Sequence, residues 1–391
     1  MGICVAALRR FVPALVVVAA AASACAAPPA TGITSCPVRT EVTLEPTDPV
    51  NFSLVRAVSP EGGQVLLSHV EGDQLVFTLR DTVVGSASVR VGTLPYPTGP
   101  QTYPPLAAVS ANGDRVVFGF AGMAFRASDP SEPLYRWSRS TGAVTRIVPP
   151  TVTAPPAGVE YPANARRLSA DGARVLWTHA YFSAPSTFTY VLTVTDAATD
   201  QVVAQHVYPD AVPVSGTWTS VFDGTTSSDA RLLTFRFGQY DTASGDLRVL
   251  TPELDAVQSA YGGGSWSAVA SSPSGRWVLV QAAAFGPATE TVNALWDSVA
   301  QEPLLLPPGN LGSSLTLTDA GTMAFTVEHS QTSTVYVRDA DGSVHALVDR
   351  TLARTWPELG APRIGSSTDV RTVVMSFADA TGNRLVAERC A

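Results

Sequence analysis

The sequence contains no lysine, so arginine accounts for all 25 residues in the combined lysine and arginine count of this 391-residue chain. This absence excludes any mechanism that needs a lysine Schiff base or a phosphate-binding lysine. Charged residues of any kind are scarce at 15%, and the formal net charge is −8. Because an acidic surface does not attract phosphate backbones, we expect no nucleic-acid partner.

Long apolar runs are also missing, except near the N-terminus. There, Arg9 and Arg10 precede an apolar run from Phe11 to Ala24. This run is shorter than the roughly 20 residues that span a bilayer comfortably. A charged start, a short apolar run and small residues at its end are typical of an export signal. We therefore predict a signal peptide over residues 1–24.

The apolar run ends in Ala22-Ser23-Ala24-Cys25, which resembles a bacterial lipobox with Ala22 in place of the usual Leu. The resemblance predicts that Cys25 is lipidated and that residues 25–36 form a flexible tether. We expect an exported monomer that is lipid-anchored to the cell envelope and meets the membrane only through this anchor. The same small residues also satisfy ordinary signal cleavage, so a secreted, soluble protein is the alternative.

A short segment recurs along the remainder, residues 37–391, at intervals of roughly 45 to 60 residues. The copies are Ala57–Leu67, Ala108–Phe118, Arg167–Trp177, Thr226–Phe235, Ala270–Val280, Leu317–Phe325 and Ser366–Met375. The pattern common to the copies is a short apolar strand, a turn that approximates Ser-X-Asp-Gly, and a second strand of β-branched and aromatic residues.

Two further strands follow in every unit except the last, and four antiparallel strands repeated at this spacing predict a propeller blade. We therefore predict an all-β, seven-bladed β-propeller in one domain. The fourth and seventh copies lack the glycine, which leaves six blades as the alternative.

The repeated turns, with the Val-Leu-Phe-type strand after each, resemble the repeats of TolB-like, WD40-like propellers. The resemblance covers almost all of residues 37–390 and implies the propeller fold. Such propellers serve as binding platforms, as regulatory caps on peptidases and as parts of envelope complexes. The resemblance therefore does not select one function.

The seventh repeat stops one strand short of a full blade, and Val38–Leu44 precedes the first repeat without a blade of its own. Propellers avoid open strand edges by closure, so we predict that Val38–Leu44 pairs antiparallel with the final strand and closes the ring. This pairing brings together the start of the first strand and the end of the last. We predict a disulfide between Cys36 and Cys390 at that point, in an oxidising compartment.

Catalytic patterns are few. The five histidines are scattered without metal-ligand spacing, and no Gly-X-Ser-X-Gly segment is present. They are His69, His179, His206, His329 and His345. We expect them to be ordinary strand or rim residues, and we predict no metal site, no cofactor and no catalytic residue. Asp339-Ala-Asp-Gly342 is expected to form a hairpin turn rather than a calcium loop.

Long loops are expected on one face of the propeller, the face opposite the Ser-X-Asp-Gly turns. These loops are residues 92–105, 149–163, 208–217, 256–266 and 351–362, and Tyr181 and Phe182 are expected in a further loop on the same side. Loops on a rigid scaffold commonly carry binding residues, and aromatic residues are enriched at interfaces. The predicted ligand-binding residues are Tyr103, Tyr161, Tyr208, Trp266 and Trp356. The alternative is that these rings pack beneath their own proline-rich loops.

The sequence thus favours a non-catalytic binding or scaffold module at the bacterial cell envelope, presenting an aromatic-rich face to a protein, peptide or glycan. The alternative is a propeller-type enzyme, a glycan hydrolase or lyase, acting in the central channel. Such an enzyme needs acidic side chains that converge at the channel. The candidate acids in the loops are Glu160, Asp210 and Glu358.

Overall fold

The structure is a computed structural model of the whole chain. It describes residues 38–44, 54–83, 87–96, 105–120, 133–169, 171–183, 187–207, 212–213, 225–227, 231–235, 238–241, 243–244, 246–249, 264–284, 291–311, 316–328, 333–339, 341–346, 363–367, 371–379 and 382–389. Within these residues no helix is both long enough and apolar enough to cross a membrane.

The fold is an all-β propeller, in which five sheets of four antiparallel strands are clear blades. One blade is β2 (Leu54–Val58), β3 (Gln64–Glu71), β4 (Gln74–Asp81) and β5 (Ser88–Pro95). The next is β6 (Pro105–Val109), β7 (Arg115–Phe120), β8 (Leu134–Ser138) and β9 (Val144–Ile147). A third blade is β15 (Thr225–Thr226), β16 (Leu232–Phe235), β17 (Gly238–Asp241) and β18 (Leu247–Val249). A fourth is β19 (Gly264–Ser271), β20 (Trp277–Ala284), β21 (Val292–Asp297) and β22 (Glu302–Leu305).

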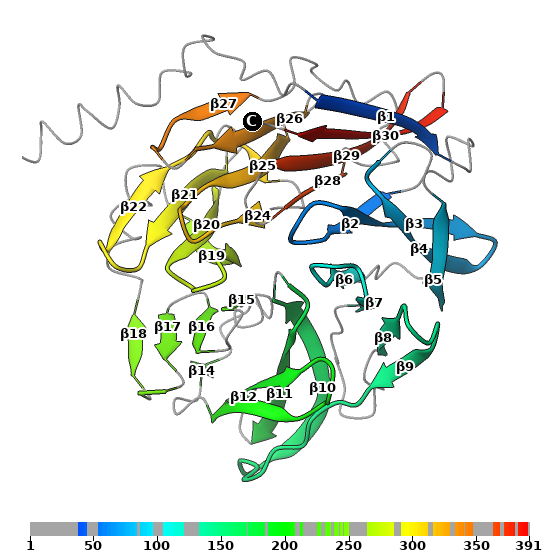
Figure 1. Cartoon of the computed structure of the whole chain (residues 1–391). Helices are drawn as coiled ribbons and strands as arrows, with labels where there is room; N and C mark the ends of the chain where they lie inside the picture. Colours follow the sequence, from blue (N-terminus) through cyan, green and yellow to red (C-terminus); the bar gives the residue numbers. More distant parts are fainter. Residues whose placement is uncertain are drawn as a thin grey trace, which may run out of the picture.

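The remaining four-stranded sheet joins the two ends of the described chain. Its strands are β28 (Arg363–Ser366), β29 (Thr372–Asp379), β30 (Gly382–Arg389) and β1 (Val38–Leu44). Strand β1 pairs antiparallel with β30, with Val38 opposite Arg389. The predicted pairing of the N-terminal strand with the final strand is therefore present, and Figure 1 shows the two strands side by side.

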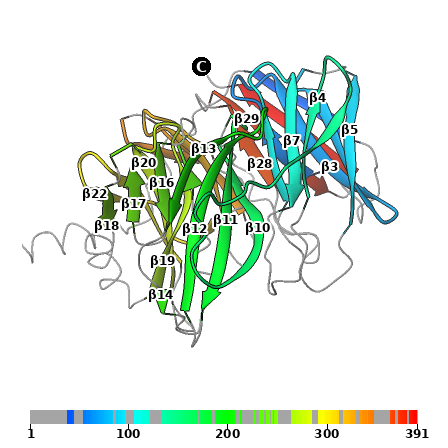
Figure 2. The same cartoon turned by 90° about the horizontal axis from the view of Figure 1, so that it is seen from below.

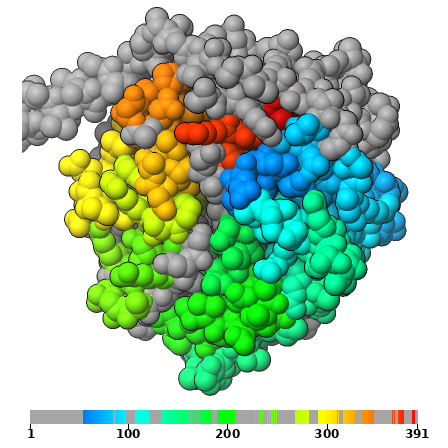
Figure 3. Space-filling view, viewed as in Figure 1, coloured from blue at the N-terminus to red at the C-terminus, as the bar shows by residue number. Residues whose placement is uncertain are grey.

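Two further sheets carry a fifth strand each. The first contains β10 (Val159–Leu168), β11 (Arg174–Ser183), β12 (Thr187–Asp196) and β13 (Val202–Val207), with β14 (Val212–Pro213) paired to β12. The second contains β23 (Asn310–Leu311), β25 (Met323–Glu328), β26 (Ser333–Arg338) and β27 (Val344–Ala346), with β24 (Thr316–Leu317) paired to β25. The sheets follow one another around the molecule in chain order, from blue to red in Figures 1 and 3.

A serine or threonine side chain fixes the turn between the first and second strand of each sheet. In the first repeat the N–H of Gln64 donates to Oγ of Ser59 at 3.0 Å, and the N–H of Gly62 donates to the Ser59 carbonyl at 2.8 Å. The side-chain bond recurs at Ser110, Ser169, Ser227, Ser272, Thr318 and Ser367. The bond persists in the fourth and seventh repeats, which lack the glycine. The hydroxyl is therefore the common element of the repeat.

The turn glycine packs directly against the neighbouring sheet. Gly62 has a φ of +73°, and a Cβ added there would lie 2.5 Å from Cβ of Thr372 in β29. Gly275 has a φ of +74°, and a Cβ there would lie 2.9 Å from Cδ1 of Leu232 in β16. Glycine is needed for two reasons, because a side chain would strain the backbone and would also separate two sheets.

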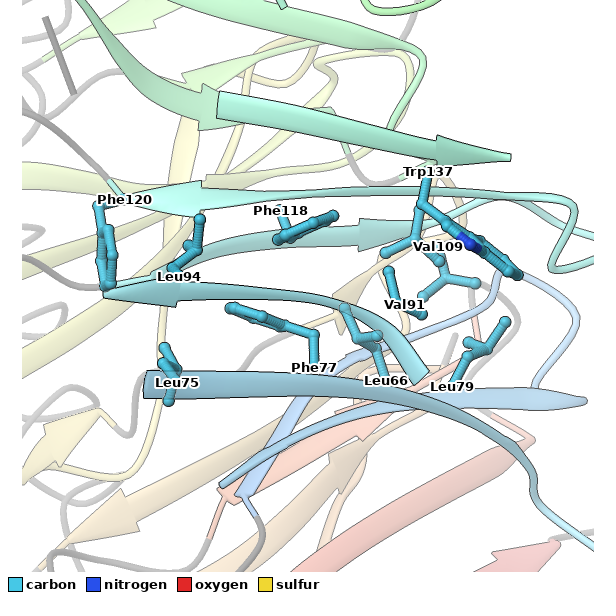
Figure 4. Close-up of a cluster of buried hydrophobic side chains, with 11 residues drawn as sticks. Leu66, Leu75, Phe77, Leu79, Val91, Leu94, Val109, Phe118, Phe120 and Trp137 are labelled. Atoms are coloured by element: carbon cyan, nitrogen blue, oxygen red, sulfur yellow. The ribbon is translucent and has the colours of Figure 1, made fainter. Parts of the chain in front are cut away.

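Apolar side chains fill the spaces between adjacent sheets. Between the β2–β5 and β6–β9 sheets, Phe77 and Phe118 lie with their ring centroids 4.9 Å apart. Figure 4 shows the cluster around them, with leucine and valine side chains from both sheets directed into the same layer. A corresponding cluster contains Val55 from β2 and Val374 from β29.

The sheet of β10 to β13 has the longest strands. Strands β10, β11 and β12 have 10 residues each, and Figure 2 shows them side by side. The hairpin between β11 and β12 closes only at Ser183 and Thr187. Because the Ser169 turn lies at the other end of β10 and β11, this extension lies at the end of the blade opposite the turn.

Candidate functional site

The structure describes little of the predicted aromatic face. Tyr103, Tyr208 and Trp356 lie outside the described residues, as do Asp210, Glu358, Cys25, Cys36 and Cys390. Tyr161 lies in β10, and the backbone of Trp266 lies in β19, opposite Ala282 of β20. Of the five predicted residues, Tyr161 alone has a described side chain, and it is partly buried.

The predicted boundaries of these loops need correction, because several of their residues lie in strands. Tyr181 and Phe182 were expected in a loop, but both lie in β11, where they face Thr189 and Phe188 of β12. Tyr161 and Trp266 belong to the loops expected at residues 149–163 and 256–266, but they lie in strands β10 and β19. Strand β11 pairs with β12 without interruption from Arg174 to Ser183, so it is longer than the usual five or six residues.

The extended end of the blade brings together Glu160 of β10 and both His179 and Tyr181 of β11. The hydroxyl of Tyr181 donates a hydrogen bond to Oε1 of Glu160 at 3.1 Å. Nδ1 of His179 lies 3.7 Å from the same oxygen. Tyr181 is 2% exposed and His179 is 1% exposed, whereas the Glu160 side chain is 55% exposed. The Glu160 carboxylate therefore faces solvent, and the hydroxyl of the buried Tyr181 ring holds one of its oxygens in place.

Strand alternation explains why these rings share one side of β11. Trp177 packs in the apolar cluster between this sheet and the β6–β9 sheet, together with Leu106 and Val117. Side chains two residues apart lie on the same face of a strand, so His179 and Tyr181 continue the face of Trp177 toward the open end. Glu160 joins them because it is the cross-strand partner of Tyr181.

A β-bulge lies directly opposite His179. Tyr161 pairs with Ala180 and Asn164 pairs with Thr178, so Pro162 and Ala163 together oppose the single residue His179. Proline has no N–H to donate to a sheet and is tolerated at such bulges, which gives a local reason for the irregularity.

This bulge differs from one that belongs to the repeat. A register shift occurs three residues before the turn serine in β2, β10 and β19, at Arg56, Arg166 and Val269. The bulge at Pro162 is a second shift in β10, whereas β19 pairs regularly with β20 at the corresponding residues, Ser265 and Trp266. It is therefore a feature of this blade and not of the repeat, and bulges of this kind often occur next to functional sites.

The electrostatics of the cluster leave one net negative charge. Burial lowers the pKa of His179, and the nearby Glu160 carboxylate opposes this shift without reversing it. The imidazole is therefore neutral at pH 7. Burial, and then the hydrogen bond to Glu160, raise the pKa of Tyr181, so its hydroxyl remains a donor. Neither ring nitrogen of His179 has a hydrogen-bond partner among the described residues.

The described residues offer little for metal binding or nucleophilic catalysis elsewhere. They contain no group of three or more histidine, cysteine, aspartate or glutamate side chains that could hold a metal ion. Ser343, His345 and Asp339 lie together, but Ser343 Oγ and Asp339 Oδ2 both meet the same nitrogen, Nε2 of His345. A proton relay uses both ring nitrogens, so this arrangement is not a catalytic triad. The predicted hairpin turn from Asp339 to Gly342 is confirmed.

From the sequence, Glu160 is expected among the loop acids, Tyr181 in an aromatic loop, and His179 as an ordinary strand or rim histidine. Two signals point to the cluster in retrospect. One is the alternation of Trp177, His179 and Tyr181, and the other is a proline, Pro162, inside an otherwise strand-like segment.

No protein-family model and no curated protein sequence matches the chain. Among solved structures, the chain is similar to the β-propeller domain of the Trilobed protease from Pyrococcus furiosus, with 13% identity and a TM-score of 0.50 over 86% of this chain and 95% of that one. It is also similar to oligogalacturonate lyase from Vibrio parahaemolyticus, with 11% identity and a TM-score of 0.51 over 91% of this chain and 95% of that one.

TolB from Acinetobacter baumannii is a more distant match, with 12% identity and a TM-score of 0.36 over 87% of this chain. The chain spans about half of TolB, 55% of its length. At such identities the similarities to the protease domain and to the lyase show the β-propeller fold alone.

Proposed function

We propose that this chain is a non-catalytic binding module at the bacterial cell envelope, which presents the long-loop face of its propeller to a protein, peptide or glycan. The observation that carries the proposal is the difference between the two ends of the blades. One end has short turns that hydroxyl hydrogen bonds hold rigidly. At the other end, the β10–β13 sheet extends beyond the repeat and carries Glu160, His179 and Tyr181.

A rigid scaffold with one elaborated end suits binding, because a preformed surface loses little conformational entropy when a partner docks. Tyr161 adjoins Glu160 on β10, and the backbone of Trp266 lies in β19, so both belong to innermost strands. We propose that the aromatic surface of this face also includes Tyr103, Tyr208 and Trp356.

The scaffold of the proposal is a ring of seven blades that the N-terminal strand closes. Seven turns with the same hydroxyl hydrogen bond support this count. The pairing of β1 with β30 and the packing of Gly62 against Thr372 support the closure. The register places Val38 opposite Arg389, and Cys36 and Cys390 lie just beyond these residues in the sequence. We propose that they form the disulfide.

Location at the envelope rests on the N-terminal sequence. A signal peptide over residues 1–24, a lipidated Cys25 and a tether over residues 25–36 would hold the propeller at a membrane surface. One acyl-type anchor binds reversibly, whereas the diacyl or triacyl modification of a lipobox cysteine holds a domain stably.

A propeller-type enzyme is the second candidate, because Glu160 and His179 are groups that acid–base catalysts use. Glycan hydrolysis usually needs two carboxyl groups about 5 to 9 Å apart. The cluster contains one carboxylate, with a histidine and a tyrosine beside it. The arrangement therefore favours binding over hydrolysis.

The test is capture of envelope components on the immobilised mature chain, in three forms. They are the wild-type chain, Tyr161→Ala on the proposed face, and Glu61→Gln in a turn at the opposite end. A partner that binds the wild-type and Glu61→Gln chains at least about tenfold more tightly than Tyr161→Ala supports the proposal. A partner that loses affinity with Glu61→Gln alone contradicts it, and turnover of a glycan by the wild-type chain favours the enzyme.

A further inference from the structure

The partners of the Glu160 carboxylate are not cations. Several described aspartates pair with an arginine: Asp196 with Arg174, Asp200 with Arg136, Asp241 with Arg231, and Asp297 with Arg276. Glu160 instead accepts from a neutral hydroxyl and lies beside an imidazole that is neutral at pH 7. The negative charge of Glu160 is therefore not neutralised by these neighbours.

The position of this charge is also fixed. The Tyr181 hydroxyl, which comes from a ring that is 2% exposed, holds Oε1 of Glu160 at 3.1 Å. Fixing a carboxylate from its buried side leaves its other lone pairs free to accept from solvent or from a ligand. An ordinary exposed glutamate loses side-chain entropy when it binds a cation, whereas Glu160 has already lost part of it.

His179 provides a second, independent sign of a binding site. Its side chain is 1% exposed, and neither ring nitrogen has a hydrogen-bond partner among the described residues. A neutral imidazole offers one acceptor nitrogen and one N–H. Unpaired polar atoms in a protein interior are unfavourable and rare, so a buried histidine of this kind requires an explanation. Nδ1 lies 3.7 Å from Glu160 Oε1, so this buried imidazole directly adjoins the exposed carboxylate.

We propose that Glu160, His179 and Tyr181 form a recognition site for a cationic side chain, a guanidinium or an ammonium group, of a polypeptide partner. The inference rests on the proposed binding function and names the ligand chemistry of that face. Guanidinium fits best, because its planar fork of N–H donors matches the two oxygens of an exposed carboxylate and because it is weakly hydrated. The net charge of −8 would also draw a cationic partner toward the chain.

A glycan fits the same residues less well. Sugar rings stack on exposed aromatic faces, but the Tyr181 ring is buried. The exposed group of the cluster is the charged carboxylate of Glu160. A divalent metal also fits less well, because the described residues contain no group of three or more histidine, cysteine or acidic side chains placed to hold one.

The test uses three peptides on the full mature chain: acetyl-Gly-Arg-Gly-amide, its lysine counterpart, and its citrulline counterpart, which has nearly the shape of arginine without the charge. The chain has five histidines, so the ring signals of His179 are resolvable by NMR, with a His179→Gln chain to assign them. We expect the arginine or lysine peptide to shift the His179 signals and to bind at least about tenfold more tightly than the citrulline peptide.

Matched variants separate a local effect from general electrostatics. Glu160→Gln keeps the shape of the side chain and removes its charge, and Glu61→Gln makes the same charge change in an exposed turn at the other end of its blade. We expect Glu160→Gln to weaken binding of the cationic peptide about tenfold and Glu61→Gln to leave it within about twofold. Tyr181→Phe, which keeps the buried ring, should weaken binding by a factor between these two.

Three outcomes would overturn the inference. They are equal affinity for the arginine and citrulline peptides, equal loss with Glu160→Gln and Glu61→Gln, and binding that EDTA abolishes, which would indicate a metal site. Capture of an envelope partner equally by the wild-type and Glu160→Gln chains would overturn the cation site and leave the binding function intact. Specific binding of the cationic peptide without capture of any envelope partner would support the cation site and count against the proposed binding function.

Discussion

The backbone N–H of Val55 donates a hydrogen bond to Oγ of Ser376 at 2.8 Å, across 321 residues of sequence. Val55 lies in β2, the first strand of its sheet, and Ser376 lies in β29, near the end of the chain. Both residues are buried. Hydrophobic packing around Val374 and Leu385 surrounds this bond. The first and last repeats are therefore in direct contact.

Replacing Ser376 with alanine should destabilise the protein by about 1–3 kcal/mol, because the buried N–H of Val55 would lose its acceptor. Urea unfolding measures this difference. Ser140→Ala removes a hydroxyl from an exposed turn and should change stability by less than about 0.5 kcal/mol. Equal stability of the Ser376→Ala and wild-type chains would show that the two ends are not packed in this way.

Three glycines give a graded test of how the turns pack. Gly62→Ala combines a φ of +73° with a contact of 2.5 Å to Thr372, Gly72→Ala has a φ of +60° in open space, and Gly63→Ala has neither constraint. We expect losses of about 3 kcal/mol or more for Gly62→Ala, about 1–2 kcal/mol for Gly72→Ala and close to zero for Gly63→Ala. Thermal unfolding should rank the variants in this order. If Gly62→Ala and Gly72→Ala lose the same amount, the contact with β29 contributes nothing.

Acid should destabilise the blades through their aspartate–arginine pairs. The hydrogen bond from Arg231 is the main cause that lowers the pKa of Asp241, and burial opposes it. Burial raises the pKa of Asp297, but Arg276 and two backbone N–H groups outweigh it and lower the pKa. A carboxyl whose folded pKa is below its unfolded value, about 3.9, stabilises fully above that value and loses its effect as pH falls through the folded pKa.

Asp241→Asn should therefore be less stable than the wild type at pH 7, by up to about 1 kcal/mol because the pair is partly exposed. Melting temperatures measured from pH 7 down to pH 2 should converge as the wild-type carboxyl is protonated. A difference that stays constant over the whole range would mean that the loss comes from the amide and not from the missing charge.

The disulfide between Cys36 and Cys390 is testable by peptide mapping without reductant. One cross-linked peptide is expected, and reduction should lower stability by up to about 5 kcal/mol, because the bridge would enclose a very long loop. Cys36→Ser provides the comparison, since it should match the reduced wild-type chain. Two free thiols in protein isolated from an oxidising compartment would disprove the bridge.

The parts of the fold that local sequence determines were predictable. The turn at Ser59 depends on a hydroxyl and an N–H five residues apart and on the positive φ of Gly62, and both are visible as a repeat. The pairing of Val38–Leu44 was also predictable, because the last repeat lacks one strand.

The cluster on the β10–β13 sheet was not predictable as a unit. Glu160 and His179 are 19 residues apart, and they meet only because the bulge at Pro162 shifts the register of β10 against β11. A single sequence contains the proline but not the pairing that converts it into a bulge. The burial of Tyr181 was not predictable either. A strand of the usual length would end before Tyr181, whereas β11 continues to Ser183.

The most direct test of the central claim, that the extended end of the blades binds the partner, is hydrogen exchange of the mature chain with and without its captured envelope partner. We predict that the partner slows exchange in peptides covering residues 159–163 and 181–187. Exchange in the turns at residues 59–62, 110–113 and 169–172 should not change, because these lie at the opposite end. If the partner slows exchange in the turns and leaves exchange at residues 159–163 and 181–187 unchanged, the partner binds the turn end of the blades and the claim is wrong.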